Sequence, residues 1–566
     1  MLGPTWMDRV AEAFPWARRQ YTAARTLVEI GLDGSVAGSE LAAALLEASS
    51  TPSPAASATV GSPLTAGRAH IDAALVALGE VADLASRLQE GGLDPRLAGQ
   101  VRSVKDALRE VAPFLRRSAA LLPLERYLLS SQHRLLVVSQ DSAELRPTGG
   151  FVGSYGILDV GPEGFRLEKY ADVYTIPDPP GRVPPPPGAD MTKDLRFHDA
   201  NWWLDFPTSA RMMLTLWRGA GQPPVDGVIA IDIVAVRDLL RVLGPVRVPS
   251  YSETFTAQNL LERLLYLIEI RSANAPGRKG VLVALASELE QRMANLDPKG
   301  LFGSVLALAK SADAKHVQMY FVDAGAQKAV LDMGWSGAIA AAPGMTDLLA
   351  VSNAMNQGGK INIAMGKSVA YEVALEADGS AEATLVLGYS NTASSAFPWS
   401  DSSTFHDYLR VYRARGSVAT PGPASSAKGS TMIVENGLPV VVRRFALPAG
   451  STHAETIVTR VPQAWRAGRG VMTPRSGVSS LAAPAPASPA SDRLGHYRLL
   501  VVRQADIEDV PTVVTVESPA GWRISSANAW KAASGETLAT STDGRSARLS
   551  TPLYGDVILD VEIERL

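Results

Sequence analysis

The sequence of 566 residues contains no cysteine. This excludes disulfides, thiolate nucleophiles and zinc–thiolate sites, although it says little about the cellular compartment. An excess of one charge sign is also missing, because the net charge is -3, so no basic field favours a nucleic-acid partner. No run of about eighteen apolar residues occurs, and the N-terminus lacks the basic-then-apolar pattern of a secretion signal. The sequence given therefore predicts no transmembrane helix.

The common catalytic signatures are absent from the sequence. It has no Walker loop, no Gly-x-Ser-x-Gly elbow and no dinucleotide-binding fingerprint. Its seven histidines show no metal-ligand spacing, which favours structural roles for them. With 46% hydrophobic and 20% charged residues, the composition is that of a folded soluble protein. The length predicts about three or four domains.

Three regions differ in their hydrophobic pattern, which predicts a multidomain α+β protein. Residues 1–128 have helical periodicity, interrupted by a Ser/Pro/Ala-rich linker at 49–65. In residues 129–364 strand-like and helix-like runs alternate, which is typical of an α/β domain. Residues 365–566 contain short alternating runs without helical signal, and these predict a β-sandwich. The strands expected in the α/β region include 134–140, 151–160, 226–231 and 317–322.

The stretch of residues 143–151 reads Ala-Glu-Leu-Arg-Pro-Thr-Gly-Gly-Phe and lies between two of these expected strands. It places Glu144 and Arg146 on a loop held by a scaffold, where functional side chains are often found. The structural alternative is an ordinary turn with glycines at positive φ and charges that face water. The spacing alone favours that alternative.

Two further polar stretches follow in the α/β region. The first places Arg196, Asp199, Asn201 and Asp205 within ten residues, beside two tryptophans. Capping of the helix that begins near Asp205 explains these residues equally well, since Asp and Asn commonly cap helices.

The second stretch, residues 271–279, contains Arg271, Arg278 and Lys279 between two amphipathic helices. Arg278 and Lys279 fall at the N-terminus of the following helix, where cations are unfavourable unless an anion joins them. This placement favours a phosphate-type ligand. A solvated turn between helices is the alternative.

Together these stretches resemble one known family, the bacterial domain-of-unknown-function family numbered 4012. The resemblance rests on residues 143–151, on 199–210, and on 226–232, which read Asp-Gly-Val-Ile-Ala-Ile-Asp. The β-rich pieces 407–412 and 497–499 are similar to its later part. Members of that family generally lie outside the cytoplasmic membrane behind an anchoring helix. The resemblance thus implies an extracytoplasmic, membrane-anchored protein of the cell envelope, with an anchor that is not present in this sequence.

A more distant resemblance is to the LytR-CpsA-Psr domain, an α/β/α sandwich that transfers glycopolymers from a polyprenyl-pyrophosphate carrier. It rests on residues 136–141, 225–249 and 256–278. The Ile-Pro-Arg-Asp motif of that domain has no counterpart, because residues 176–178 read Ile-Pro-Asp. The second acid that would stand beside the metal is also missing after Arg146.

The second resemblance implies roles for particular residues. Arginines bind phosphate in a bidentate manner, and Mg²⁺ on a carboxylate neutralises the remaining charge. Arg146, Arg271 and Arg278 would clamp the pyrophosphate, Asp141 would hold Mg²⁺, and Asp199 or Asp205 would act as a base. Four further residues would contact the ligand: Glu144, Arg196, Asn201 and Lys279.

The sequence therefore leads to two hypotheses about function. In the first, the protein binds a polyprenyl-pyrophosphate-linked glycan, and an extension of this hypothesis is that it also transfers the glycan. In the second, it is a non-catalytic envelope or surface scaffold that acts through protein partners. The first requires Asp141, Arg146 and a late arginine to meet beside an apolar pocket. The second expects the arginines to scatter or to pair with surface acids.

Overall fold

The computed structural model describes residues 15–50, 68–108, 114–115, 117, 119–189, 193–271, 278–339, 344–394, 397–399, 403–420, 431–467 and 493–566. The chain divides into two compact units. The helical residues up to Gln132, joined by Val160–Arg166, form one unit. His133–Asp159 and the chain from Leu167 onward form the other, which therefore contains both the α/β region and the β-rich region.

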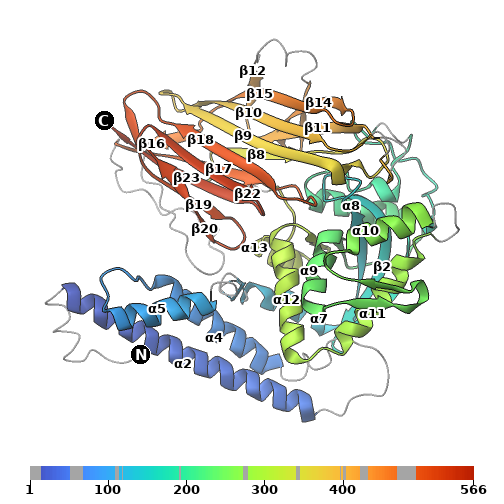
Figure 1. Cartoon of the computed structure of the whole chain (residues 1–566), viewed down its shortest axis with the longest axis horizontal. Helices are drawn as coiled ribbons and strands as arrows, with labels where there is room; N and C mark the ends of the chain where they lie inside the picture. The colour runs from blue at the N-terminus through green and yellow to red at the C-terminus, as the bar shows by residue number, and fades with distance from the viewer. Residues whose placement is uncertain are drawn as a thin grey trace. The chain divides into compact units, whose positions relative to one another are not determined.

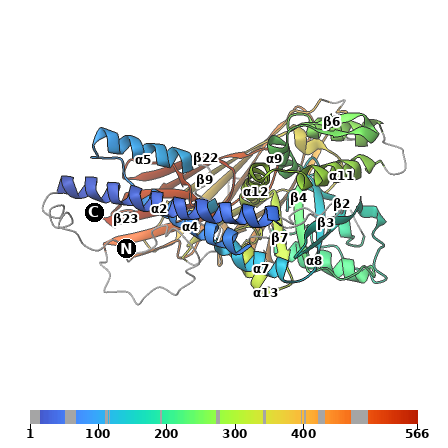
Figure 2. The same cartoon turned by 90° about the horizontal axis from the view of Figure 1, so that it is seen from below.

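The first unit is helical, as the sequence predicts. Its elements are α2 (Pro15–Ser50), α4 (Arg68–Arg87), α5 (Pro95–Leu108), the short 3₁₀ turn η1 (Ala119–Leu121) and α7 (Leu122–Ser130). Helix α2 runs beside α4 (Figure 2). Ile30 of α2, Val81 of α4 and Val101 of α5 meet in one buried cluster. The linker expected at 49–65 lies outside the described residues from position 51 onward. None of the described helices has the length and hydropathy needed to cross a membrane.

The α/β region is built on a five-stranded sheet with the order β3-β2-β1-β4-β7. Its strands are β1 (His133–Asp141), β2 (Phe151–Gly161), β3 (Gly164–Asp172), β4 (Gly227–Asp232) and β7 (Val317–Phe321). Strand β1 runs parallel to β4, with Leu136 opposite Val228, while β4 and β7 are antiparallel. Short strands β5 (Val246–Val248) and β6 (Glu253–Phe255) form a separate pair.

Helices pack through apolar residues on this sheet and on the β5–β6 pair. They are α8 (Phe206–Gly219), α9 (Ile233–Leu243), α10 (Leu260–Leu265), the π-helical turn η5 (Tyr266–Arg271), α11 (Gly280–Ala294), α12 (Pro298–Asp313) and α13 (Ala324–Asp332). Met213 and Trp217 of α8 pack on Leu136 and Val138 of β1. Helices α9 and α12 contact each other, α9 also contacts β1 and β4, and α12 also contacts the edge strand β7. The mixed α and β character is confirmed, whereas the α/β/α layering implied by the resemblance stays a prediction.

Two large sheets form the C-terminal region, seen in yellow to red in Figure 1. The seven-stranded sheet has the order β12 (Val418–Thr420), β15 (Thr452–Val461), β10 (Ala381–Asn391), β9 (Met365–Leu375), β18 (Val510–Glu517), β22 (Ser546–Leu553), β21 (Thr540–Thr542). The nine-stranded sheet has the order β13 (Thr431–Glu435), β14 (Leu438–Leu447), β11 (Phe405–Arg413), β8 (Asp347–Ser352), β17 (Leu494–Val502), β23 (Val557–Arg565), β19 (Trp522–Lys531), β20 (Thr537–Leu538), and β16 (Trp465–Ala467) pairs with β17.

One hydrophobic core lies between these two sheets. It contains Tyr371 and Val514 from the first sheet and Val411 and Leu559 from the second. Two sheets that share a core in this way match the predicted β-rich C-terminal sandwich. Strand β8 pairs with β11 and β17, so the nine-stranded sheet begins before residue 365. The apolar sequence of β8 resembles that of the strands in the α/β region. Only its pairing with β11 and β17 shows that it belongs to the nine-stranded sheet.

Candidate functional site

The loop of residues 142–150 joins β1 to β2 and is buried along its whole length. Arg146 is 1% exposed, and Glu144 is 8% exposed. The expectation that the charges of this turn face water is therefore wrong. The chain around residues 353–362 and 504–506 covers the loop, since Gln504 Nε2 donates to the Arg146 carbonyl and the Asn362 N–H donates to the Ala143 carbonyl.

Glycines at 149 and 150 allow the loop to lie this close to its neighbours. A Cβ on Gly150 would overlap the carbonyl group of Asp141. Gly149 has a φ of 127°, and a Cβ there would lie 3.1 Å from Ala505 Cβ. Side chains are therefore excluded at both positions, which explains the Gly-Gly pair of the motif.

Asn201 fixes the loop from the side of the α/β sheet. Its Nδ2 atom contacts Gln140 Oε1 and Thr148 Oγ1, each at 2.9 Å, and the Gly150 carbonyl at 2.7 Å. Gln318 Nε2 donates to the Thr148 carbonyl at 2.7 Å. Asn201 is fully buried, so the structure gives this predicted ligand-binding residue a positioning role.

Replacing Asn201 with alanine is expected to lower the free energy of unfolding by about 2 kcal/mol, because buried acceptors lose their donor. Urea unfolding measures the change. The matched control is Asn295→Ala, which removes an exposed hydrogen bond at the end of α11. Equal stability of the two variants would contradict the positioning role.

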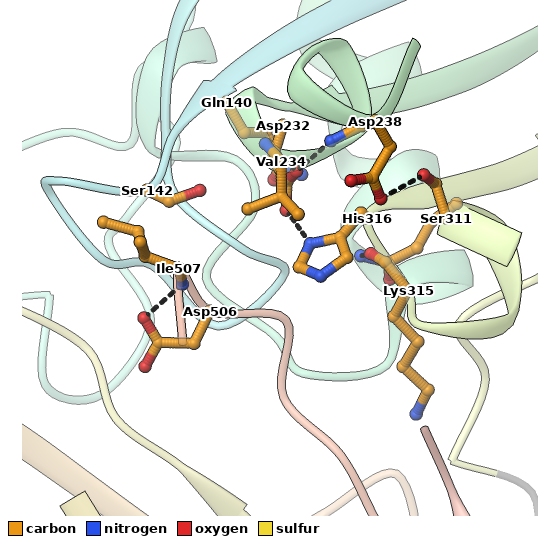
Figure 3. Close-up of polar contacts among 12 residues, drawn as sticks. Gln140, Ser142, Asp232, Val234, Asp238, Ser311, Lys315, His316, Asp506 and Ile507 are labelled. Carbon is orange, nitrogen blue, oxygen red and sulfur yellow. Dashed lines mark hydrogen bonds and ion pairs between the residues drawn. The ribbon is translucent and has the colours of Figure 1, made fainter. Parts of the chain in front are cut away.

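A second buried polar group lies behind the loop and is drawn in Figure 3. Asp232 caps α9 through the Val234 N–H at 2.9 Å, and its second oxygen lies 2.6 Å from His316 Nδ1. Arg503 Nη2 lies 3.2 Å from His316 Nε2. A guanidinium only donates, so Nε2 accepts and Nδ1 carries the proton that bonds Asp232. His316 therefore connects the α/β region to the segment after β17.

Arg146 points from the loop toward Phe151. Its Nη1 donates to the Met355 carbonyl at 2.7 Å, and its Nη2 lies 3.1 Å from Glu144 Oε1 and 3.7 Å from Asp199 Oδ1. The guanidinium carbon is 5.6 Å from the centroid of the Phe151 ring. This is a cation–π distance, so the ring and two carboxylates hold the charge.

Asp199 and His198 stand beside this arginine, at the end of the 3₁₀ turn η3 (Phe197–Asp199). The second Asp199 oxygen lies 3.2 Å from His198 Nε2, and the His198 ring is 5.5 Å from that of Phe151. Burial alone would raise the pKa of Asp199, but His198 and Arg146 outweigh it and lower the pKa. The carboxylate is thus held ionised, which makes it a weak base.

Lys360 is the central residue that the sequence reading missed. Its Nζ lies 2.9 Å from Asp141 Oδ2, 3.1 Å from Glu144 Oε2 and 3.9 Å from Glu269 Oε1. Burial would lower the pKa of Lys360, but these carboxylates outweigh it and raise the pKa. The only local signal is a polar, glycine-rich run that ends in this lysine, Asn-Gln-Gly-Gly-Lys. Nothing in that run indicates a contact with residue 144.

Arg278 and Lys279 enter from the start of α11. Arg278 Nη1 lies 3.1 Å from Glu269 Oε2, and Lys279 Nζ donates to the Gly153 carbonyl at 2.7 Å and lies 3.2 Å from Asp172 Oδ1. Carboxylates of the protein are thus the anions that join these cations at the helix N-terminus. Residues 272–277 of the predicted turn lie outside the described residues.

The pKa of Lys279 shows that this compensation is incomplete. Burial lowers the pKa, and the pairing with Asp172 only partly opposes that effect. Arg278 and Lys360 then repel the ammonium and lower the pKa further. The ammonium lies 5.1 Å from the Tyr174 ring and 6.0 Å from the Phe151 ring.

We call this group the Phe151 cluster: Asp141, Glu144, Arg146, Phe151, Asp172, His198, Asp199, Glu269, Arg278, Lys279 and Lys360. It contains five carboxylates and four arginine or lysine side chains. A cavity of about 210 Å³ adjoins it, lined by Tyr174, Asp178, Pro179, Arg196, His198 and Leu216. His198 belongs to both, and its ring is 5.1 Å from that of Tyr174. The cavity therefore opens directly beside the charged groups.

Besides Asn201, described above, three of the predicted site residues lie outside the cluster. Arg196 lines the cavity, where it is half-exposed and 3.6 Å from Asp178. Asp205 caps α8 by accepting from the Thr208 N–H at 3.0 Å, and its other oxygen accepts from the Ile339 N–H at 3.0 Å. Arg271 is exposed at the end of η5. The capping alternative thus describes Asp205.

The predicted magnesium site does not fit the donors around Asp141. Its Oδ2 faces Lys360, and its Oδ1 accepts from the Ala143 N–H at 3.0 Å. In the part of the chain that the structure describes, no group of three or more acidic or histidine residues could hold a metal ion. We therefore derive no step through Mg²⁺.

Comparison with known proteins supports the first resemblance. Residues 131–267 match the family described as "Protein of unknown function (DUF4012)". Among solved structures, TagV of B. subtilis, a LytR-CpsA-Psr family protein, is 14% identical, with 37% of this chain and 80% of that chain covered and a TM-score of 0.21. An M1 zinc metallopeptidase from Deinococcus radiodurans is 13% identical over 36% of this chain, with a TM-score of 0.18, and the match spans only 42% of its length. No curated protein matches the sequence.

Proposed function

We propose, for a chain whose residues 131–267 match the DUF4012 family, that the Phe151 cluster and its cavity bind the pyrophosphate of a polyprenyl-linked glycan. The observation that carries the proposal is the convergence of cations from three separate segments. Arg146, Lys360 and Lys279 all lie within 6.0 Å of the Phe151 ring centroid. The cell envelope, outside the membrane, is the location that goes with this ligand.

The electrostatics of Lys279 support an anionic ligand. A pKa below the usual range means that the ammonium costs free energy in this place. A phosphate in the adjoining cavity would stabilise the charged form and raise the pKa again. Arg278 and Arg196, whose side chains are 38% and 54% exposed, are the cations that an entering ligand can reach.

The polar lining of the cavity favours the headgroup over the prenyl chain. Arg196 and His198 both line it, and both can donate hydrogen bonds to phosphate oxygens. In this proposal the tail lies outside the described cavity.

Transfer of the glycan would require, besides this binding site, a residue that accepts a proton. Asp199 is the predicted base that touches the cluster, while Asp205 is occupied as a helix cap. The lowered pKa of Asp199 makes it a poor acceptor near neutral pH. Lys279, whose pKa burial lowers, is the better candidate for holding or moving a proton.

A scaffold function is the second candidate, and one observation favours it. The five carboxylates of the cluster already compensate its cations, as in a purely structural network. In that case the envelope partner would be a protein, and the cavity would bind no pyrophosphate.

Binding of farnesyl pyrophosphate, followed by calorimetry, tests the proposal. Arg278→Ala and Arg196→Ala are each expected to weaken binding about tenfold or more, because each removes a charge-assisted hydrogen bond. Arg241→Ala is the matched control, since it removes an exposed arginine that pairs with Asp238 on α9. Absence of binding by the unmodified protein, or equal affinity of all three variants, would support the scaffold function instead.

A further inference from the structure

The ammonium of Lys360 lies in a pocket of three carboxylates that come from separate elements. Asp141 ends β1, Glu144 belongs to the loop, and Glu269 lies on the π-helical turn η5. Lys360 itself stands just before the 3₁₀ turn η6 (Ile361–Ala364) and reaches Asp141 and Glu144 across more than 200 residues of sequence. Its side chain is only 12% exposed.

We propose that Lys360 is the resident cation of this acidic pocket and takes the place that a divalent metal ion would otherwise fill. The protein would then bind its anionic ligand without Mg²⁺. Ligand binding without Mg²⁺ rests on the proposed function, whereas the occupation of the pocket by Lys360 concerns the protein alone.

The charges around Lys360 balance without a metal ion. Glu144 is shared with Arg146 at 3.1 Å, and Glu269 is shared with Arg278 at 3.1 Å. Asp141 pairs with Lys360 alone among the cations of the cluster. Three carboxylates therefore meet three cations. A divalent ion added beside the ammonium would leave surplus positive charge in a mostly buried site, which is costly.

Hard cations require oxygen ligands at about 2.0–2.6 Å. The carboxylates that could supply them are turned toward the Lys360 ammonium at hydrogen-bonding distances. A metal ion and the ammonium would compete for the same oxygens. Removal of the ammonium alone would free Asp141 Oδ2 and Glu144 Oε2 together, and Glu269 lies next to both.

The test needs no ligand, only Mn²⁺ as a probe measured by electron paramagnetic resonance. The unmodified protein and Lys360→Arg, which keeps the charge, are expected to bind no Mn²⁺ at this site. Lys360→Ala is expected to bind one Mn²⁺ at least tenfold more tightly than the unmodified protein does, and to gain thermal stability when MnCl₂ is added. Adding Glu144→Gln to Lys360→Ala should remove the gain.

Two results would overturn the inference. One is stoichiometric Mn²⁺ binding by the unmodified protein that Asp141→Asn abolishes, which remains measurable even if Lys360→Ala fails to fold. The other is a folded Lys360→Ala protein with no gain in Mn²⁺ affinity.

Farnesyl pyrophosphate binding with EDTA or with MgCl₂ separates this inference from the proposed function. Affinity that agrees within about twofold in the two buffers supports the resident lysine. A tenfold loss in EDTA would overturn the inference while the proposed function stands. If the probe does not bind in either buffer, the proposed function fails, and the Mn²⁺ experiment alone decides the role of Lys360.

Discussion

Replacing Asp347 with alanine is expected to lower the free energy of unfolding by about 4 kcal/mol, enough to remove a large part of a typical protein's stability. Asp347 begins β8 and is 1% exposed in the core of the sandwich. Its loss leaves the guanidinium of Arg413, also 1% exposed, without its carboxylate partner. Urea unfolding of the unmodified protein and of the variant measures the effect.

The geometry around Asp347 explains why the effect is large. Its Oδ1 accepts from Arg413 Nη2 at 3.1 Å, while its Oδ2 accepts from the hydroxyls of Tyr371 at 2.6 Å and Tyr497 at 2.8 Å. Burial raises the pKa of both tyrosines well above the usual value, and the nearby carboxylate adds to this. Both hydroxyls therefore stay protonated and donate. Four buried donors, the Leu348 N–H among them, lose one acceptor group when Asp347 is removed.

A double substitution separates the buried charge from the packing. Asp347→Leu combined with Arg413→Met removes both charges, so it should cost clearly less than the sum of the two single changes. Asp347→Asn keeps an acceptor without the charge and should be intermediate. A loss below about 1 kcal/mol for Asp347→Ala would contradict an ionised Asp347 in the core.

The sequence revealed this network only in part, although it predicted the elements that carry it. Alternating apolar residues predicted strands in the C-terminal region because side chains of a strand alternate between core and solvent. The same rule treats a buried polar residue as a break in the pattern, so it conceals Asp347 and Arg413. Asp347 and Arg413 are 66 positions apart, and they meet only because β8 pairs with β11.

Helix α12 shows a different kind of omission. The sequence reading placed no helix between residues 295 and 316, although Asp297 followed by Pro298 is a typical helix start. In the structure the Asp297 carboxylate accepts from the Gly300 N–H at 2.7 Å and α12 follows. The Asp297-Pro298 pair is thus a local signal in the sequence for the start of α12.

The candidate site also combines residues that the sequence indicates with residues that it does not. Residues 143–151 drew attention because two charges and two glycines lie between strands, and the structure places Arg146 at the centre of the cluster. Lys360 comes from a segment 216 positions away from Glu144, so spacing could not join them. The predicted base Asp205 lies outside the cluster as the cap of α8, because proximity in sequence to Asp199 does not bring the two carboxylates to one place.

Asp407 should make the stability of the protein depend on pH between about 4 and 7. The residue is 1% exposed in β11, and burial raises its pKa from 3.8 to about 7, against the opposing effects of Asn353 and Lys367. A carboxyl whose folded-state pKa is raised stabilises the fold when protonated. That contribution is fully present below the unfolded-state pKa of 3.8 and is lost as the pH rises through 7. The shift corresponds to about 4 kcal/mol.

Comparison with Asp407→Asn isolates this carboxyl from every other titrating group. The amide cannot ionise, so the variant should gain stability relative to the unmodified protein by about 1.4 kcal/mol for each pH unit inside the window. Above pH 7 the difference should become constant at about 4 kcal/mol. Urea unfolding at several pH values from 4 to 8 measures it, and a difference that does not change with pH would contradict the raised pKa.

The same carboxyl is linked to the Phe151 cluster through one short segment. Asp407 accepts from Asn353 Nδ2 at 2.6 Å and from the Ala354 N–H at 2.9 Å, and the next residue, Met355, pairs with Asp407 in a β-bridge. The Met355 carbonyl holds Arg146 at 2.7 Å. Ionisation of Asp407 places a buried charge, which Lys367 and Arg410 compensate only in part, in contact with this segment. Loss of stability above pH 7 is therefore expected to loosen the support of Arg146 first, and Asp407→Asn should preserve ligand affinity at pH 8 where the unmodified protein loses it.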